Sequence, residues 1–159
     1  MILIIKKIFI TFICLLSLCS VNIVTPNLAI AQSSWSAKSA YKQVSCYGPY
    51  EGETITATGK YITNDTKYIA VPYQRIVSKK TWKHLSKKNK YKYFYYGQKI
   101  RLSRGNKHII ASVQDCGGFL NYGCYYKGKW RQRLFDLTPA VFNKLKIYDI
   151  GLVKFQWKK

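Results

Sequence analysis

The sequence predicts a small, mainly β barrel with one or two short helices. Runs rich in β-branched and aromatic residues recur between glycine, proline and asparagine punctuation. One well-marked helix signature follows these runs and precedes a final β-rich run. No internal repeat is visible, and 159 residues suffice for one compact domain behind a targeting segment.

Residues 1–31 have the features of a signal peptide. Lys6 and Lys7 form a positive start, an apolar run covers 8–24, and Ala29 and Ala31 form the small-x-small pattern of a cleavage site. An uncleaved membrane anchor is the alternative, since the length of the apolar run permits one. We expect cleavage after Ala31 and a secreted or cell-wall-associated protein.

The next stretch, residues 32–45, is Ser-rich and polar and predicts a short leader of low order, with the folded domain covering 46–159. Residues 54–63 are dense in β-branched side chains and predict a strand, in which Gly59 would mark a bulge or a close backbone approach. The run KYIAVP, residues 67–72, predicts a second strand that the proline ends.

Residues 78–96 form a basic and aromatic insertion. Its first half predicts a short helix capped by Ser78, with Trp82 and Leu85 on one face. The insertion is either a solvated loop with some buried tyrosines or a surface for anionic polymers, because lysines neutralise phosphates and aromatic rings stack on sugars. Its candidate binding residues are Lys83, Lys87, Lys88 and Tyr93.

The C-terminal half has clearer signals. The runs QKIRLS and HIIASVQD, joined by RGNK, predict a hairpin with Gly105 in its turn. LTPAVFNKLKI predicts a helix with Thr138 as its cap and Pro139 at its first position. GLVKFQW predicts the closing strand. The helix residues expected in the core are Val141, Phe142 and Leu145.

Charge narrows the class of partner. The chain carries a formal net charge of +21, and the signal segment holds two of its 27 basic residues, which leaves 25 against six acidic residues, or +19, after cleavage. Such a charge favours an anionic partner: a cell-wall polymer, a membrane surface or nucleic acid. An AT-rich genome would also favour lysine codons, although it does not explain why acidic residues are so scarce.

Three cysteines remain after the expected cleavage: Cys46, Cys116 and Cys124. In an oxidising compartment one disulfide is expected, and the pair nearest in sequence, Cys116 and Cys124, is favoured. No zinc spacing is present, so no metal and no small-molecule cofactor are expected.

Six segments occur in an order that is similar to the double-psi β-barrel domains of the RlpA-like, expansin-like and three-aspartate superfamily. They are TATGKYI, IAVP, YGQKIRL, IIASVQDCGGF, LFDLTPAVFNKL and IGLVKFQW, and they span about residues 47–157. The resemblance implies a six-stranded double-psi barrel that binds cell-wall glycan in an open groove. It places Tyr47, Thr58, Gly117, Gly118 and Phe119 among the sugar-binding residues.

The same resemblance makes Asp115 and Asp136 candidate catalytic residues. Paired glycines after Asp115 would allow positive φ or a close approach of the ligand, and the apolar neighbours of Asp136 would raise its pKa. A lytic transglycosylase needs one acid, because the sugar's own hydroxyl displaces the leaving group, so Asp136 is the expected acid/base and Asp115 its orienting partner. The alternative is structural: Asp115 caps a turn and Asp136 binds backbone N–H groups.

The sequence departs from the pattern at IAVP, where three-aspartate domains read IAVDP, and neither His84 nor His108 matches the histidine of RlpA-like domains. The expected function is therefore a monomeric, secreted protein that acts on cell-wall glycan, as a peptidoglycan lytic transglycosylase or as a non-catalytic, expansin-like binder of anionic polysaccharide. A secreted nucleic-acid-binding protein is the disfavoured third reading, because no catalytic histidine pair or metal cluster is present.

Overall fold

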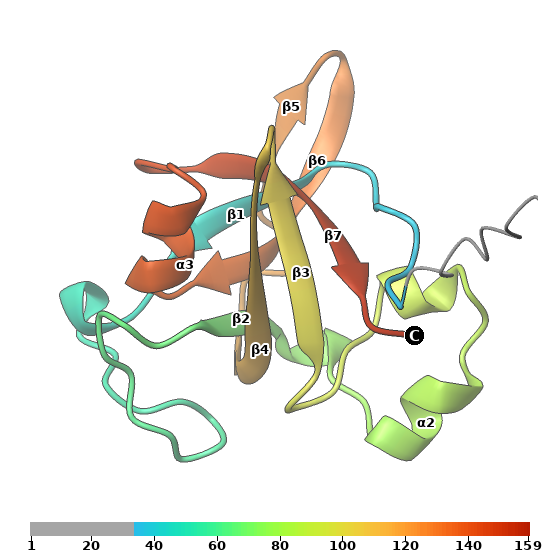
Figure 1. The fold of residues 1–159 in the computed structure, drawn as a ribbon, viewed down its shortest axis with the longest axis horizontal. Coiled ribbons are helices and arrows are strands. Elements are labelled where there is room, and N and C mark those ends of the chain that lie inside the picture. The colour runs from blue at the N-terminus through green and yellow to red at the C-terminus, as the bar shows by residue number, and fades with distance from the viewer. Residues whose placement is uncertain (1–33) are drawn as a thin grey trace, which may run out of the picture. The chain divides into compact units, whose positions relative to one another are not determined.

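A computed structural model describes residues 34–159, and the predicted signal peptide lies outside the described residues. Figure 1 shows strands that wrap around a common interior, with helices at the periphery. Two α-helices and three single 3-10 turns accompany the strands in the described part. The strands are β1 (Lys42–Cys46), β2 (Tyr68–Pro72), β3 (Lys99–Arg104), β4 (Lys107–Gly117), β5 (Gly123–Tyr126), β6 (Lys129–Leu137) and β7 (Gly151–Trp157). The helical elements are η1 (Pro49–Glu51), η2 (Tyr73–Arg75), α2 (Lys79–His84), η3 (Asn89–Tyr91) and α3 (Pro139–Lys144).

Six of these strands close into a ring. The order is β1-β7-β3-β4-β2-β6, and an additional pairing of β1 with β6 completes the circle. Two pairs, β1 with β6 and β2 with β4, are parallel, and the other four pairs of the ring are antiparallel. Closure leaves no unpaired edge in the ring. The predicted mainly β class is therefore confirmed, and the closed ring is consistent with a small double-psi β-barrel.

The interior of the barrel is aromatic. Phe94, Phe135 and Phe155 are fully buried, and the Phe135 and Phe155 rings meet edge to face at 5.1 Å between centroids. On β7 every second residue is buried, which is the period of a strand with one face to the core. The strands pack around this centre, and the candidate site lies near the ends of β4 and β6.

Several predicted elements are confirmed. The KYIAVP run forms β2, and the β3–β4 hairpin turns at Gly105, whose φ is +58°. Helix α2 begins after Ser78, whose hydroxyl accepts a hydrogen bond from the Thr81 N–H at 3.0 Å. The GLVKFQW run forms β7.

Residues 34–45 are not a leader of low order. They run along β7 as an ordered segment that continues into β1. The backbone N–H of Ser39 donates to the Phe155 carbonyl, and its hydroxyl accepts from the Phe155 N–H, each at 2.9 Å. Ser36 makes the same pair of contacts with Trp157. Ser36 and Ser39, two of the serines that suggested disorder, are buried and accept hydrogen bonds from the backbone of β7.

Residues 54–63 form a loop instead of the expected strand. One isolated bridge joins Ile55 to Tyr61, and the chain reverses at Gly59, whose φ is +74°. β2 already pairs with β4 on one side and with β6 on the other, so the 54–63 segment cannot add a strand beside it. Its β-branched residues therefore lie in a loop. The glycine does mark unusual backbone, as expected.

The predicted Cys116–Cys124 disulfide is absent: both thiols, and that of Cys46, are free. Cys124 lies in the β5–β6 hairpin, which places it opposite Arg131. Cys116 ends elsewhere, on β4, where its sulfur accepts a hydrogen bond from the Tyr96 hydroxyl at 3.1 Å. The two cysteines therefore belong to different strand pairs.

Helix α3 starts where predicted, and Val141, Phe142 and Leu145 are buried. Thr138, however, makes no side-chain cap. Its hydroxyl accepts a hydrogen bond from the Tyr68 N–H at 3.1 Å and donates to the Thr66 carbonyl at 2.5 Å, so it ties the helix start to β2. Among residues 34–159, no helix has the length and apolar character needed to cross a membrane.

Candidate functional site

Strand register places the two predicted aspartates on either side of one small residue. Ala70 of β2 pairs with Asp115 on β4 and with Asp136 on β6. Because paired residues on neighbouring strands point to the same face of a sheet, both carboxyl groups flank the alanine methyl. Two strand spacings separate the aspartate Cα atoms by about 10 Å. The short Ala70 side chain leaves a hollow between them.

That hollow is a groove of about 390 Å³. Its floor is apolar, since Tyr47, Ala70 and Phe119 pack with Ile62 in a small cluster of their own. The rest of its wall is mostly polar and includes a third carboxyl group, that of Glu53. The lining residues are Tyr47, Glu53, Ile55, Ala70, Asp115, Cys116, Gly117, Gly118, Phe119 and Asp136.

A β-bulge precedes each aspartate. On β4 the register with β2 shifts between Val113 and Asp115, so Gln114 is the extra residue. On β6 the register with β1 shifts between Arg133 and Phe135, so Leu134 is the extra residue. A bulge re-aims the side chains that follow it. The two parallel strand pairs therefore present their aspartates by the same local device.

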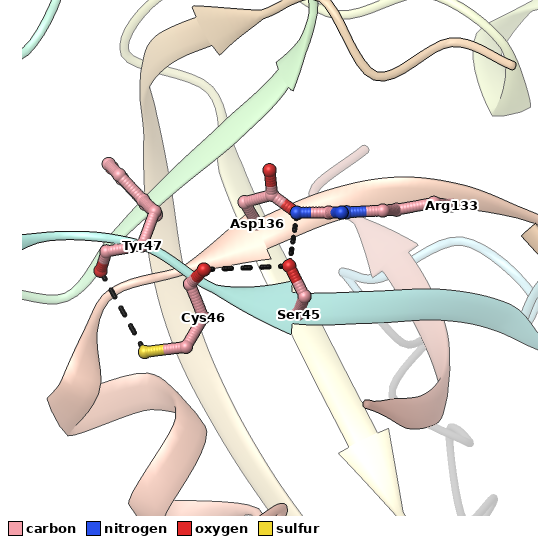
Figure 2. Close-up of polar contacts among 5 residues, drawn as sticks. All are labelled: Ser45, Cys46, Tyr47, Arg133 and Asp136. Atoms are coloured by element: carbon pink, nitrogen blue, oxygen red, sulfur yellow. Dashed lines mark hydrogen bonds and ion pairs between the residues drawn. The ribbon is translucent and has the colours of Figure 1, made fainter. Parts of the chain in front are cut away.

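Asp136 is held by two donors on one oxygen. Its Oδ1 accepts a hydrogen bond from Arg133 Nε at 2.6 Å and one from the Ser45 hydroxyl at 2.9 Å. Figure 2 shows the other carboxylate oxygen pointing away from both donors. Asp136 is 7% exposed and lines the groove, so this second oxygen is its free acceptor. The bulge at Leu134 explains why residues three apart on a strand can meet.

Burial raises the pKa of the Asp136 carboxyl, whereas the hydrogen bond and charge of Arg133 and the hydrogen bond from Ser45 act in the opposite direction. Burial is the largest of these effects, so the net change is upward. The carboxyl is thus easier to protonate than an exposed aspartic acid. A group in this condition can donate a proton at a pH where an ordinary aspartate cannot.

Asp115 has a structural duty. Its Oδ1 accepts hydrogen bonds from the backbone N–H of Ala57 and of Cys116, both at 2.9 Å. The first of these ties the 54–63 loop over the end of β4. Asp115 therefore binds backbone N–H groups, as the structural alternative expected of a capping residue. The residue also lines the groove.

Tyr47 contributes a hydroxyl with no partner. The residue is 4% exposed, and among residues 34–159 its Oη is one of the few buried polar side-chain atoms without a hydrogen bond. Burial raises the pKa of this phenol, and Asp115, Glu53 and Asp136 raise it further. The phenol therefore stays protonated as a donor. A buried donor without an acceptor costs free energy, which a bound oxygen atom would recover.

Three of the six acidic residues in the chain line this one groove. Partial burial raises the pKa of Glu53, and Asp115, Asp136 and Glu51 add to the rise. Burial and the charges of Glu51 and Asp136 likewise raise the pKa of the Cys46 thiol, which remains protonated and therefore a weak nucleophile. Within residues 34–159 no three His, Cys, Asp or Glu side chains stand together as a metal site.

The paired glycines Gly117 and Gly118 were expected to allow positive φ or a close approach of the ligand. Neither Gly117 nor Gly118 has a positive φ. A Cβ on Gly117 would lie 3.0 and 3.1 Å from two ring atoms of Phe119, so this position needs glycine for close packing. A Cβ on Gly118 would meet only Tyr73, at an ordinary 3.9 Å.

The remaining candidates lie outside the groove lining. Thr58 donates to Gln114, so its hydroxyl fixes the loop to β4. Lys83 is on α2, and Tyr93 packs against the main core beneath the Arg75 guanidinium. Lys87 and Lys88 line other hollows. The candidate lysines of the insertion and the acidic groove therefore lie on separate surfaces.

The sequence reasoning missed Ser45, Glu53, Ala70 and Arg133. Arg133 pairs with Asp136 and also covers the Phe119 ring at 5.2 Å and the Tyr122 ring at 5.7 Å. Its spacing from Asp136 gave no signal, because on a regular strand residues three apart face opposite sides. Ala70 could have been found, since it lies inside the IAVP segment that carried the resemblance.

Fold and groove together define a small closed β-barrel with an acidic groove at one end of its strands. No family model and no curated protein matches the sequence. Among solved structures, the chain is similar to the Streptomyces papain inhibitor, with a TM-score of 0.47, 14% identity, and coverage of 78% of this chain and 96% of that one. It is also similar to an apo expansin of Clavibacter michiganensis, with a TM-score of 0.45, 15% identity, and coverage of 75% and 50%. At these values neither protein's activity carries over to this chain.

Proposed function

We propose that this protein is secreted and that its groove binds cell-wall glycan. The observation that supports this most is the convergence, on an apolar floor, of two fixed carboxylates and the unpartnered Tyr47 hydroxyl. Carboxylates accept hydrogen bonds from sugar hydroxyls, a phenol donates to their oxygens, and a flat ring such as Phe119 contacts the apolar face of a sugar. A neutral or amino sugar suits an acidic groove better than an anionic one.

The test is sedimentation of the mature protein with purified, insoluble cell walls, followed by release with soluble glycan fragments. Tyr47→Phe removes only the unpartnered hydroxyl, so it should weaken binding by roughly 3- to 20-fold, in line with one lost hydrogen bond to ligand. Asp149→Asn, at an exposed acid outside the groove, is the charge-matched control for Asp136→Asn. Equal binding by wild type and both groove variants would contradict the proposal.

A second candidate function is a lytic transglycosylase. It is favoured by the raised pKa of the Asp136 carboxyl and by the free second oxygen of that group. Asp136 would protonate the glycosidic oxygen, and the sugar's own 6-hydroxyl, after losing its proton to the resulting carboxylate, would displace the leaving group at the anomeric carbon. The product is an anhydro sugar, and no water is consumed.

Mass analysis of glycan released from cell walls distinguishes the two functions. For the enzyme, Asp136→Asn should lower anhydro-product formation by roughly 100-fold, far more than it weakens wall binding. A folded wild-type protein that binds walls but releases no anhydro product would leave the binding function alone.

A further inference from the structure

A second surface, at the opposite end of β1 from the groove, is made of lysines. Lys38, Lys42, Lys88 and Lys92 line a hollow of about 360 Å³ with Ser39, Ala40 and Tyr91. A second hollow, of about 460 Å³, is lined by Ser36, Ala37, Lys87, Lys90, Trp157 and Lys159. The residues of one lining are sequence neighbours of the other, as Ala37 is of Lys38 and Lys87 is of Lys88. The two hollows therefore form one continuous strip, here called the lysine strip.

The lysine strip is built by two segments that the sequence keeps far apart. The Tyr91 hydroxyl donates to the Ala37 carbonyl at 2.8 Å, which clamps η3 of the insertion to the 34–41 segment. Figure 1 shows the light-green insertion beside that segment and the C-terminal end of β7. The lysine charges therefore sit on an ordered framework.

No acidic side chain balances the charge of the strip. Seven lysines and no acidic residue line the two hollows. Within residues 34–159 the one ion pair joins Arg133 to Asp136, so the strip lysines have no acidic partner. Burial lowers the pKa of Lys42, and the charges of Arg75, Arg131 and Lys92 lower it further. Cations held together in this way are stabilised when an anion enters among them.

The aromatic residues of the strip pack against the core of the protein. Tyr91 lies edge-on to Trp157, with ring centroids 4.1 Å apart, and also contacts Phe155. Trp157 is 5% exposed. Proteins that bind single-stranded nucleic acid offer free rings to the bases. The strip offers charge without such rings, which favours a polyanion that has no bases.

We propose that the lysine strip binds a flexible linear polyanion without bases, such as a polyol-phosphate or uronate chain. The strip lies about 16 Å from the groove, the length of the five residue-to-residue steps from Lys42, at the start of β1, to Tyr47, just after its end. The two sites are thus far enough apart to be occupied at once. Binding at the strip does not depend on the groove, so this proposal stands or falls separately from the proposed function.

The experiment measures the affinity of the mature protein for a long-chain polyphosphate and for polygalacturonate between 50 and 300 mM salt. In the strip variant, Lys38, Lys88 and Lys92 become Gln. In the control variant, Lys80, Lys83 and Lys99 become Gln; these are equally exposed lysines, two from the same insertion, and none lines the strip. Both variants lose the same net charge.

The slope of log affinity against log salt should fall by about 2 in the strip variant, since each neutralised contact contributes roughly 0.7. In the control variant the slope should change by less than half of that. Equal losses in both variants would overturn the proposal, because they would indicate a response to net charge alone. Comparison of the two polymers identifies the anion. Single-stranded DNA of equal charge that bound more than tenfold tighter than either polymer would instead assign the strip to nucleic acid.

Unchanged melting temperatures establish that the variants are folded. Asp136→Asn, measured in the same assay, should leave polyanion binding as in the wild type. If polyanion binding were lost in Asp136→Asn and retained in the strip variant, the anion would have to bind at the groove, and the strip proposal would be wrong.

Discussion

Replacement of Arg133 by Gln tests how the candidate acid is controlled. Arg133 donates a 2.6 Å hydrogen bond to Asp136 Oδ1, and its side chain is 24% exposed, so solvent screens the pair only partly. Glutamine keeps a polar side chain but removes the charge. At neutral pH the loss of a charged hydrogen bond should destabilise the protein by about 1.5 to 3 kcal/mol.

The effect should depend on pH in a defined direction. Burial already raises the pKa of Asp136 above that of an unfolded aspartate, and Arg133 opposes the rise. Without Arg133 the pKa rises further, so the folded variant takes up a proton at a higher pH than the unfolded chain. A raised carboxyl pKa gives stability that is present at low pH and lost as the pH rises through the folded-state value. The difference in stability between variant and wild type should therefore shrink as the pH falls.

Urea unfolding at pH 7 and at pH 4.5 measures this difference, and carboxyl carbon chemical shifts measured against pH report the Asp136 pKa directly. Asp136→Asn is the matched background: in it, Arg133→Gln should cost much less and show little pH dependence, as a double-mutant cycle would reveal. A loss that is the same at both pH values, or an Asp136 pKa that does not rise in the variant, would refute the reasoning.

Three further changes test other parts of the structure. Gly117→Ala places a Cβ about 3.0 Å from the Phe119 ring, so it should lower stability by roughly 1 to 3 kcal/mol and narrow the groove, visible as a lower melting temperature and weaker wall binding. Lys42→Met should raise the melting temperature at neutral pH, because burial disfavours the charged amine of Lys42 and lowers its pKa. At alkaline pH the amine becomes neutral, so the wild type should recover part of the difference. No gain in melting temperature at neutral pH would contradict the account. Ser39→Ala leaves the buried Phe155 N–H without the hydroxyl acceptor that lies 2.9 Å away, and chemical unfolding should show a loss of roughly 1 to 3 kcal/mol, whereas a freely moving leader would show none.

Elements with local signals could be predicted from the sequence. The β3–β4 hairpin has a glycine turn between two β-rich runs, and α2 has a serine cap before an apolar pair. These signals depend on residues near in sequence, and the structure confirms them. Strand β1 has no such signal, because Lys42–Cys46 mixes polar and apolar residues without a clear period. It becomes a strand through its partners, β6 and β7, which lie at the other end of the chain.

The candidate site divides in the same way. Asp115, Asp136, Tyr47 and Phe119 were expected from the resemblance to a known superfamily, and the structure brings all four to one groove. Glu53 lies just before the 54–63 loop that was expected to be a strand, and no rule of spacing places its side chain. The two bulges follow from register, which depends on the closed ring as a whole.

The position of β1 between β6 and β7 also determines when the barrel can form. Gln43 pairs with Arg133 and with Leu152, so the ring closes only after most of the chain, β7 included, is available. Contacts between such distant residues make folding slow compared with that of helical domains of similar size. The entropy cost of closing a long loop comes before the contacts that offset it have formed. Until β7 emerges, an elongating chain has no closed barrel to form. A fold completed this late leaves the polypeptide unfolded for longer, which is the state in which a chain can be threaded through a narrow translocation channel.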